Sequence, residues 1–216
     1  GTALVFEGKQ AQCMLAENYA TTRESLPTEA MTVSAWVSVD TPRQWGGIIG
    51  TIQDNGNSEQ GWVLGYDDHT FYFALATKGA DDGNGLMTYL KAKTRYTPGK
   101  LYHVTAVYDG KTMELYINGK RETTSAVQSG AILYPKAAPY VIGAYRDSDE
   151  FHPHHGRIRE IKLYGDAAKA DWVAQEFDKD KALAEAPANL QEPEFKLLAA
   201  PYLQFATQTT MTVMWH

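Results

Sequence analysis

Apolar and polar residues alternate in short segments along most of the chain, and this period of two is typical of strands with one buried face. Turn residues separate the segments. The strongest hairpin signals are Asp109-Gly110 and Asn118-Gly119, because these residues tolerate the positive φ that tight hairpin turns need. Many strands at regular spacing predict an all-β, antiparallel two-sheet sandwich of the jelly-roll type. The predicted strands include 31–39, 61–66, 70–77, 86–92, 101–108, 112–117 and 139–145.

A short C-terminal helix is predicted after the strands, at about 166–178. Asp166 is a suitable N-cap residue, and Trp172, Val173 and Phe177 fall on one face of such a helix. We therefore expect this helix to pack one apolar side against the sandwich.

The pattern divides the chain into a sandwich domain over 1–184, a linker over 185–194 and a further segment over 195–216. The linker is predicted because it holds two prolines and has no periodicity. The last segment alternates like a strand but is too short to bury a core alone, so we expect the truncated start of a second β-domain. Gly1 stands before a strand-like run without an initiator Met, and we expect the chain to be part of a longer exported protein.

Composition narrows the classes of function. The 216 residues are 44% hydrophobic, which is enough for one sizeable core. The formal charge of −6 disfavours nucleic acid as a partner, because an acidic surface repels phosphates. No apolar stretch reaches the ~18 residues of a membrane span. Cys13 is the only cysteine, so no internal disulfide forms, and its alternating context predicts a small buried side chain.

Several short motifs follow one another over residues 3–178. They are Ala3–Gly8, Met31–Val37, Tyr102–Gly110, Glu114–Gly119, Val141–Gly143 and Gly156–Tyr164. This ordered set resembles the laminin-G-like members of the concanavalin-A-like lectin/glucanase superfamily. The resemblance implies a jelly-roll sandwich that acts as a binding module.

The same resemblance bears on calcium, because in some relatives the first and last strands help to hold a structural calcium ion. Here Glu7 stands where an Asp is usual, and Arg159 replaces an Asp of the last strand. These two departures disfavour that calcium site.

A second resemblance concerns residues 200–204 and 209–215. They are similar to the start of the fibronectin-like domain that precedes the catalytic domain of purple-acid-phosphatase-type metallophosphoesterases. This implies a parent hydrolase with a two-metal centre, whose ligands lie outside the present sequence.

We tested the sequence for chemistry of its own. A glycoside hydrolase needs two carboxylates roughly 5–9 Å apart, and two acids on one strand face would supply them. Glu114 and Glu160 are each the only acid inside their predicted strand. There is no G-x-S-x-G motif, and Cys13 has no neighbouring base. The chain is therefore predicted to be non-catalytic.

The segment 147–155 is the most unusual one for chemistry, because three carboxylates and three imidazoles lie within nine residues. It predicts a bound divalent metal, calcium or a transition metal, and the mixture of donors suits a transition metal better. The alternative is a solvated loop. The candidate ligands are Asp147, Asp149, His152, His154 and His155.

Aromatic residues are the second group of candidates. Trp36 lies on one strand face with two serines, an arrangement that can stack on a sugar ring, although packing under the helix is the favoured alternative. Trp45 and Trp62 are near turns, and Tyr66 follows Trp62 on the same predicted strand. We consider all four as candidate ligand-binding residues.

Two hypotheses of function remain open. In the first, the chain is a non-catalytic accessory module that binds a glycan or another cell-surface ligand at the N-terminus of a secreted metallophosphoesterase. In the second, it is a structural spacer that packs on its own downstream catalytic domain without a ligand. Both place the protein outside the cytoplasm: secreted, periplasmic or on the cell surface.

Overall fold

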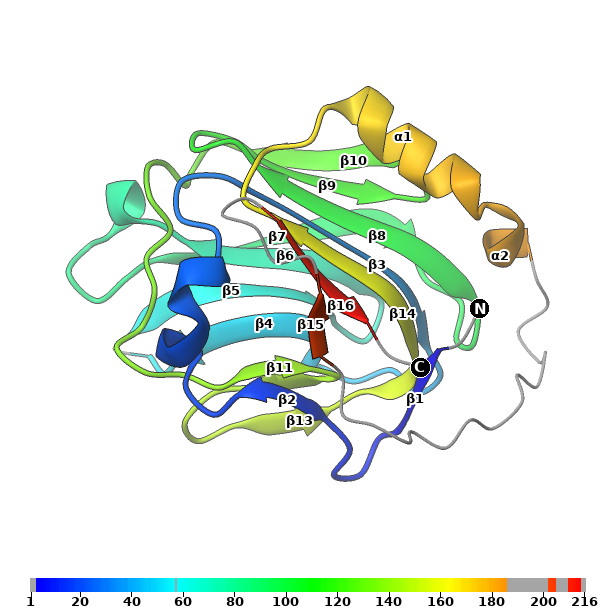
Figure 1. The fold of residues 1–216 in the computed structure, drawn as a ribbon, viewed down its shortest axis with the longest axis horizontal. Coiled ribbons are helices and arrows are strands. Elements are labelled where there is room, and N and C mark those ends of the chain that lie inside the picture. Colours follow the sequence, from blue (N-terminus) through cyan, green and yellow to red (C-terminus); the bar gives the residue numbers. More distant parts are fainter. Residues whose placement is uncertain (1–2, 57, 186–201, 205–209, 215–216) are drawn as a thin grey trace.

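The computed structural model describes residues 3–56 and 58–185, together with the backbone of residues 202–204 and 210–214. Two antiparallel sheets face each other and enclose the core, so the predicted sandwich is confirmed (Figure 1). Sheet A has the order β10-β9-β8-β3-β14-β16-β15, and β1 also pairs with β14. Its strands are β1 (Leu4–Glu7), β3 (Met31–Val39), β8 (Leu101–Tyr108), β9 (Met113–Ile117), β10 (Lys120–Ser125), β14 (His155–Tyr164), β15 (Tyr202–Gln204) and β16 (Thr210–Met214).

Sheet B has the order β2-β11-β4-β5-β6-β7, and a separate hairpin of β12 and β13 follows β11. The predicted strand 139–145 is divided in two, because Gly143 adopts a positive φ of 81° between β11 and β12. The strands are β2 (Cys13–Ala16), β4 (Gly46–Asp54), β5 (Glu59–Tyr66), β6 (Thr70–Ala76), β7 (Met87–Arg95), β11 (Tyr140–Ile142), β12 (Ala144–Arg146) and β13 (Phe151–Pro153).

The predicted hairpin turns are present in sheet A. Asn118 and Gly119 have φ values of 50° and 75°, the left-handed pair that a tight turn between β9 and β10 needs. The Oδ1 atom of Asp109 accepts hydrogen bonds from the backbone N–H groups of Lys111 and Thr112, which closes the turn between β8 and β9. Local chemistry therefore fixes this edge of the sheet.

The helix begins later than the sequence indicates. It covers α1 (Ala170–Lys179), and the hydroxyl of Thr32 is the reason. This hydroxyl donates to the carbonyl of Asp166 (2.7 Å) and accepts from the N–H of Ala168 (2.8 Å), which holds residues 166–168 against β3 in a non-helical conformation. Asp166 is thus a tether and not the N-cap. The other helices among the described residues are α2 (Ala182–Glu185) and two 3₁₀ segments, Tyr19–Ser25 and Lys78–Ala80.

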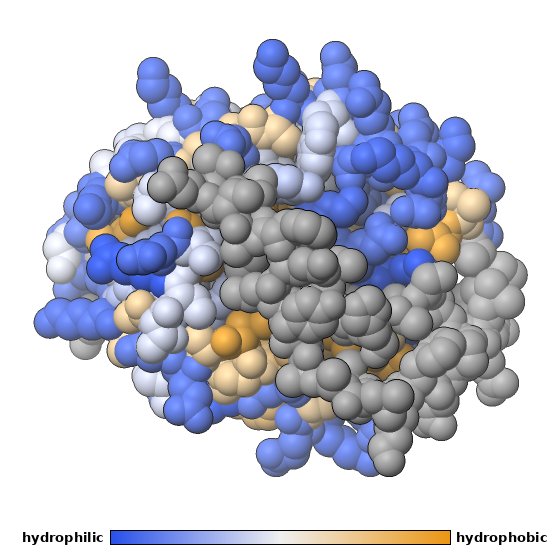
Figure 2. Space-filling view, viewed as in Figure 1, coloured by the Kyte–Doolittle hydropathy of each residue, from blue (hydrophilic) through white to orange (hydrophobic). Residues whose placement is uncertain are grey.

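Helices α1 and α2 lie along the outer side of sheet A, near β8 and β10 (Figure 1). Seen from the same side, hydrophilic side chains line the upper rim of the molecule and the exposed side of α1 (Figure 2). Among the described residues, no helix has both the length and the apolar composition that a membrane span requires.

Part of the C-terminal segment joins the sandwich. Strand β16 pairs with β14 through Lys162–Tyr164, on the edge that β1 occupies at residues 155–158. Of the predicted linker 185–194, only Glu185 is described, as the end of α2, and the other residues of 195–216 outside β15 and β16 also lie outside the described residues.

Candidate ligand-binding site on the outer face of sheet B

Trp36 has no surface that a ligand can reach, because it is only 1% exposed. It lies on the outer face of sheet A, where Phe177 of α1 stacks on it at 5.8 Å and His103 of β8 is 5.2 Å away. The helix therefore covers the outer face of sheet A at Trp36, in agreement with the favoured alternative that this residue packs under the helix.

Trp62 and Tyr66 point from β5 into the core between the sheets, and both are fully buried. The indole N–H of Trp62 donates to the hydroxyl of Tyr134 at 3.0 Å. The hydroxyl of Tyr66 lies 2.9 Å from Nδ1 of His154. Their polar atoms thus serve internal hydrogen bonds, and neither residue is accessible to a ligand.

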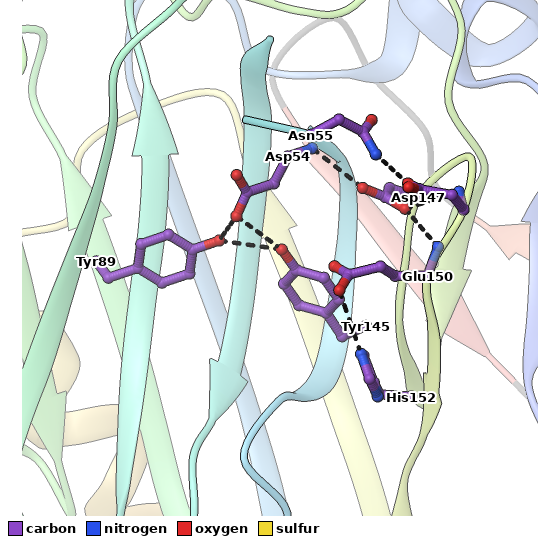
Figure 3. Close-up of polar contacts among 8 residues, drawn as sticks. Asp54, Asn55, Tyr89, Tyr145, Asp147, Glu150 and His152 are labelled. Carbon is purple, nitrogen blue, oxygen red and sulfur yellow. Dashed lines mark hydrogen bonds and ion pairs between the residues drawn. The ribbon is translucent and has the colours of Figure 1, made fainter. Parts of the chain in front are cut away.

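The carboxylates of the predicted metal segment serve a turn. Oδ1 of Asp147 accepts from the N–H groups of Asp149 and Glu150, and its Oδ2 accepts from the N–H of Asp54 at 3.2 Å. The carboxylate of Asp149 accepts a hydrogen bond from the side chain of Asn55. These acids join the 147–150 turn to the end of β4 (Figure 3).

The three histidines of that segment point to three different places. His152 lies 3.7 Å from Glu150 on the surface, His154 is buried in the core, and Nδ1 of His155 lies 2.7 Å from the hydroxyl of Thr41. Neighbouring residues of an extended chain face opposite ways, which separates His154 from His155. Among the described residues, no group of three or more His, Cys, Asp or Glu is arranged to hold a metal ion.

Small residues occupy the middle strands on the outer face of sheet B, and neighbouring groups pack closely over them. Two cross-strand rows run from β4 to β7, and each ends in a long side chain on β7. A glycine has no side chain, so neighbouring groups take its place: Cζ of Tyr72 lies 2.6 Å from the Cβ position of Gly65, and the carbonyl oxygen of Ala144 lies 2.0 Å from that of Gly47. The rows are Gly50, Val63, Ala74 and Tyr89, and Gly47, Gly65, Tyr72 and Lys91.

Tyr89 and Tyr145 share one carboxylate oxygen at the end of β4 (Figure 3). Both hydroxyls donate to Oδ2 of Asp54, that of Tyr145 at 3.0 Å, and the two hydroxyl oxygens are 3.0 Å apart. Burial, the other tyrosine and Asp54 all raise the pKa of Tyr89, and burial is also the largest cause of the raised pKa of Tyr145. Both rings therefore stay neutral and are held in fixed positions.

Trp45 lies directly before β4 and is half-buried. Its ring centroid is 5.6 Å from that of Tyr89 and 5.8 Å from that of Tyr145, so the three rings pack together. Trp45 and Tyr89 are half-buried and present an aromatic surface, whereas Tyr145 is only 1% exposed and supports them from within. Beside this surface is a cavity of about 210 Å³. Its lining residues are Gln44, Trp45, Asp67, Asp68, His69, Tyr72 and Lys91.

The polar wall of the cavity contains an ion pair. Nζ of Lys91 lies 2.8 Å from Oδ2 of Asp67, and Oδ1 of Asp67 accepts from the N–H groups of His69 and Thr70. Burial raises the pKa of Asp67, but the bonds from Lys91 and the two amides outweigh burial and lower it. The wall thus offers a fixed carboxylate and an ammonium group with its remaining donors directed to solvent.

The sequence identified only Trp45 of this site. Asp54 is 35 residues from Tyr89 and 91 residues from Tyr145 in the sequence. No local spacing of residues could indicate that these three side chains meet. Asp67 and Asp68 directly follow the predicted strand 61–66, so the sequence could have indicated a turn at this side of the cavity.

The model of a laminin-G family, described as the concanavalin A-like lectin/glucanases superfamily, matches residues 16–174. Pappalysin-1 of Mus musculus is 28% identical over 173 residues, and that of Homo sapiens is 27% identical over the same length. Each alignment covers 75% of this chain, which spans only about a tenth (10%) of these relatives.

Two solved structures share the fold at low sequence identity. The CBM40 domain of the Ruminococcus gnavus IT-sialidase, bound to α2,3-sialyllactose, has a TM-score of 0.65 at 15% identity. The match covers 82% of this chain and 97% of the CBM40 chain. The heptameric SAP-like pentraxin of Limulus polyphemus has a TM-score of 0.55 at 18% identity, and the match covers 79% of this chain and 78% of the pentraxin chain.

Proposed function

Because the chain belongs to the concanavalin A-like lectin/glucanases superfamily, we propose that it is a non-catalytic module that binds a glycan. The observation that carries this proposal is the aromatic surface of Trp45 and Tyr89, supported by the buried ring of Tyr145, beside a cavity with a polar wall. The solved sialidase domain, which holds a sialylated sugar, is a relative in fold that supports a glycan as the ligand class.

The chemistry of a sugar ring suits these groups. One side of a pyranose presents C–H groups that stack on an aromatic ring, while its hydroxyls need hydrogen-bond partners at the edge. Trp45 supplies a half-buried ring, and Asp67 and Lys91 supply an acceptor and a donor that lie 2.8 Å apart. The cavity is smaller than the ~300–1,000 Å³ typical of drug-sized ligands, so it fits one ring of a glycan chain.

We further propose that the module stands at the N-terminus of a secreted, periplasmic or cell-surface metallophosphoesterase of the calcineurin-like or purple-acid-phosphatase type. This part rests on the motif similarity of residues 200–204 and 209–215 alone. In that protein the two-metal centre belongs to the downstream catalytic domain, and the module holds the enzyme near glycan-bearing substrates.

The spacer hypothesis has one observation in its favour. Strand β16 pairs with β14, so the chain after the sandwich is placed directly on its edge. Near this edge is an apolar hollow of about 320 Å³, lined in part by Tyr164 and Trp172. A spacer would use this side for interdomain packing and would leave the outer face of sheet B without a ligand.

A glycan array separates the two hypotheses. We expect the chain to bind a subset of glycans, and Trp45→Ala to weaken binding at least ~10-fold, the effect of losing an important contact residue. Trp172→Ala is the matched control, because this half-buried tryptophan lies on α1, away from sheet B. Equal loss in both variants, or no binding by the wild-type chain, would contradict the proposal.

A further inference from the structure

We propose that this site selects uncharged glycans and discriminates against glycans that end in a carboxylated sugar such as sialic acid. The inference rests on the proposed function and adds the class of ligand. It comes from the distribution of charge around Trp45 and the adjoining cavity.

The ammonium group that lines the cavity, that of Lys91, is already paired with a carboxylate. The lining residues that carry a carboxylate or an ammonium group are Asp67, Asp68 and Lys91. The ammonium group of Lys91 lies 2.8 Å from Oδ2 of Asp67. A ligand carboxylate that approaches Lys91 must therefore compete with Asp67 and also face the charge of Asp68.

The opposite end of the aromatic surface is acidic as well. Asp54, at the far end of β4 from Trp45, accepts from the hydroxyls of Tyr89 and Tyr145. The turn that adjoins Asp54 adds three more carboxylates, which are Asp147, Asp149 and Glu150. A negative group on the ligand would meet like charges at both ends of the site.

The other basic residues near the site do not line the cavity. Arg43 precedes Trp45 by two residues, but its guanidinium donates to the carbonyl of Gly8 at 2.7 Å. The guanidinium of Arg146 lies over the ring of Phe151 at 5.6 Å. Lys93 and Arg95 continue the outward row of β7 beyond Lys91 and do not line the cavity.

An uncharged sugar makes use of the same groups. Carboxylates accept hydrogen bonds from hydroxyls and donate none, whereas an ammonium group only donates. Asp67 and Lys91 therefore offer complementary partners at 2.8 Å, a separation suited to two neighbouring hydroxyls of one ring. A neutral polyol can form charge-assisted hydrogen bonds with both groups, whereas a ligand carboxylate can form them only with Lys91.

The test is an array in which each neutral glycan is printed beside its sialylated counterpart. We expect the wild-type chain to bind the neutral member at least ~10-fold more tightly. Asp67→Asn should reduce this ratio several-fold, because it removes one negative charge and releases Lys91. The amide oxygen of the new side chain can still accept from the N–H groups of His69 and Thr70, so the turn is kept.

Asp109→Asn is the matched control. Asp109 also accepts two backbone N–H groups in a hairpin turn, and its replacement changes net charge equally in sheet A. An equal change in the ratio for Asp67→Asn and Asp109→Asn would refute the local effect. Binding of sialylated glycans as tight as that of neutral ones, and dependent on Trp45, would overturn the inference and leave the proposed function intact. Absence of any glycan binding would overturn the proposed function and this inference with it.

Discussion

His103 makes the stability of this protein depend on pH in a way that one substitution can isolate. The side chain projects from β8 under the helices, with the ring of Trp36 at 5.2 Å and that of Phe177 at 6.3 Å, and it is 4% exposed. Burial is the main cause that lowers its pKa from 6.5 to about 4. Lys162 lowers the pKa further, whereas Glu176 and Asp180 oppose the shift.

The sign follows from proton binding. Between pH 6.5 and about 4, the histidine is more protonated in the unfolded chain than in the folded one, so the free energy of unfolding decreases as the pH falls. A difference of one pH unit in pKa corresponds to about 1.4 kcal/mol. His103 therefore removes roughly 2 kcal/mol between pH 7 and pH 5, and roughly 3 kcal/mol by pH 4.

The perturbation is His103→Phe, which keeps an aromatic ring between Trp36 and Phe177. Nδ1 of His103 is buried and has no hydrogen-bond partner among the described residues, so the variant loses no bond at that atom. Urea unfolding followed by tryptophan fluorescence at pH 7 and pH 5 measures the effect. We expect the variant to lose about 2 kcal/mol less than the wild-type chain over this interval.

Two further measurements make the result decisive. His69→Gln, at an exposed turn, should follow the wild-type pH dependence. Burial also lowers the pKa of His154, to about 3, so both proteins should keep a remaining dependence of the same sign. If His103→Phe and the wild-type chain lose equal stability, or if NMR shows His103 titrating near 6.5, the reasoning from burial is refuted.

Three other substitutions test separate parts of the structure. Trp36→Ala should cost about 3–5 kcal/mol in urea unfolding, because it empties a buried site between sheet and helix, and an unchanged midpoint would contradict that packing. Gly47→Ala should strongly lower the melting temperature, since a Cβ there would lie 2.0 Å from the carbonyl oxygen of Ala144, and a wild-type melting temperature would exclude this close approach. Tyr145→Phe removes one donor to Asp54 and should cost about 1 kcal/mol of stability with a small loss of glycan affinity, whereas unchanged values of both would show that the network does not support the site.

The sequence alone was sufficient for the fold because its signals are local. Alternation along 31–39 and 101–108 matches β3 and β8, and the turn residues at 118–119 have the positive φ that their types favour. The ordered motifs also indicated the superfamily, which the match over residues 16–174 confirms. None of these inferences requires knowledge of which distant segments meet.

Tertiary structure decided which predicted residues a ligand can reach. Alternation placed Trp36 on the face opposite the core, but only the return of α1 shows that this face is covered. The helix itself starts late because Thr32, 134 residues earlier, binds the carbonyl of Asp166. The polar carboxylates of the 147–150 segment form a turn, and one of them reaches Asp54, 93 residues away.

In the candidate site, some features follow from neighbouring residues in the sequence and others only from the fold. Sequence could mark Trp45 as an aromatic residue near glycines, since that is a matter of neighbours along the chain. It could not place Tyr89, Tyr145 and Asp54 together, because their hydrogen bonds join residues 35, 56 and 91 positions apart. Local propensity acts over a few residues, whereas the geometry of a binding site is set by sheet register and by the burial of surfaces that meet only in the folded state.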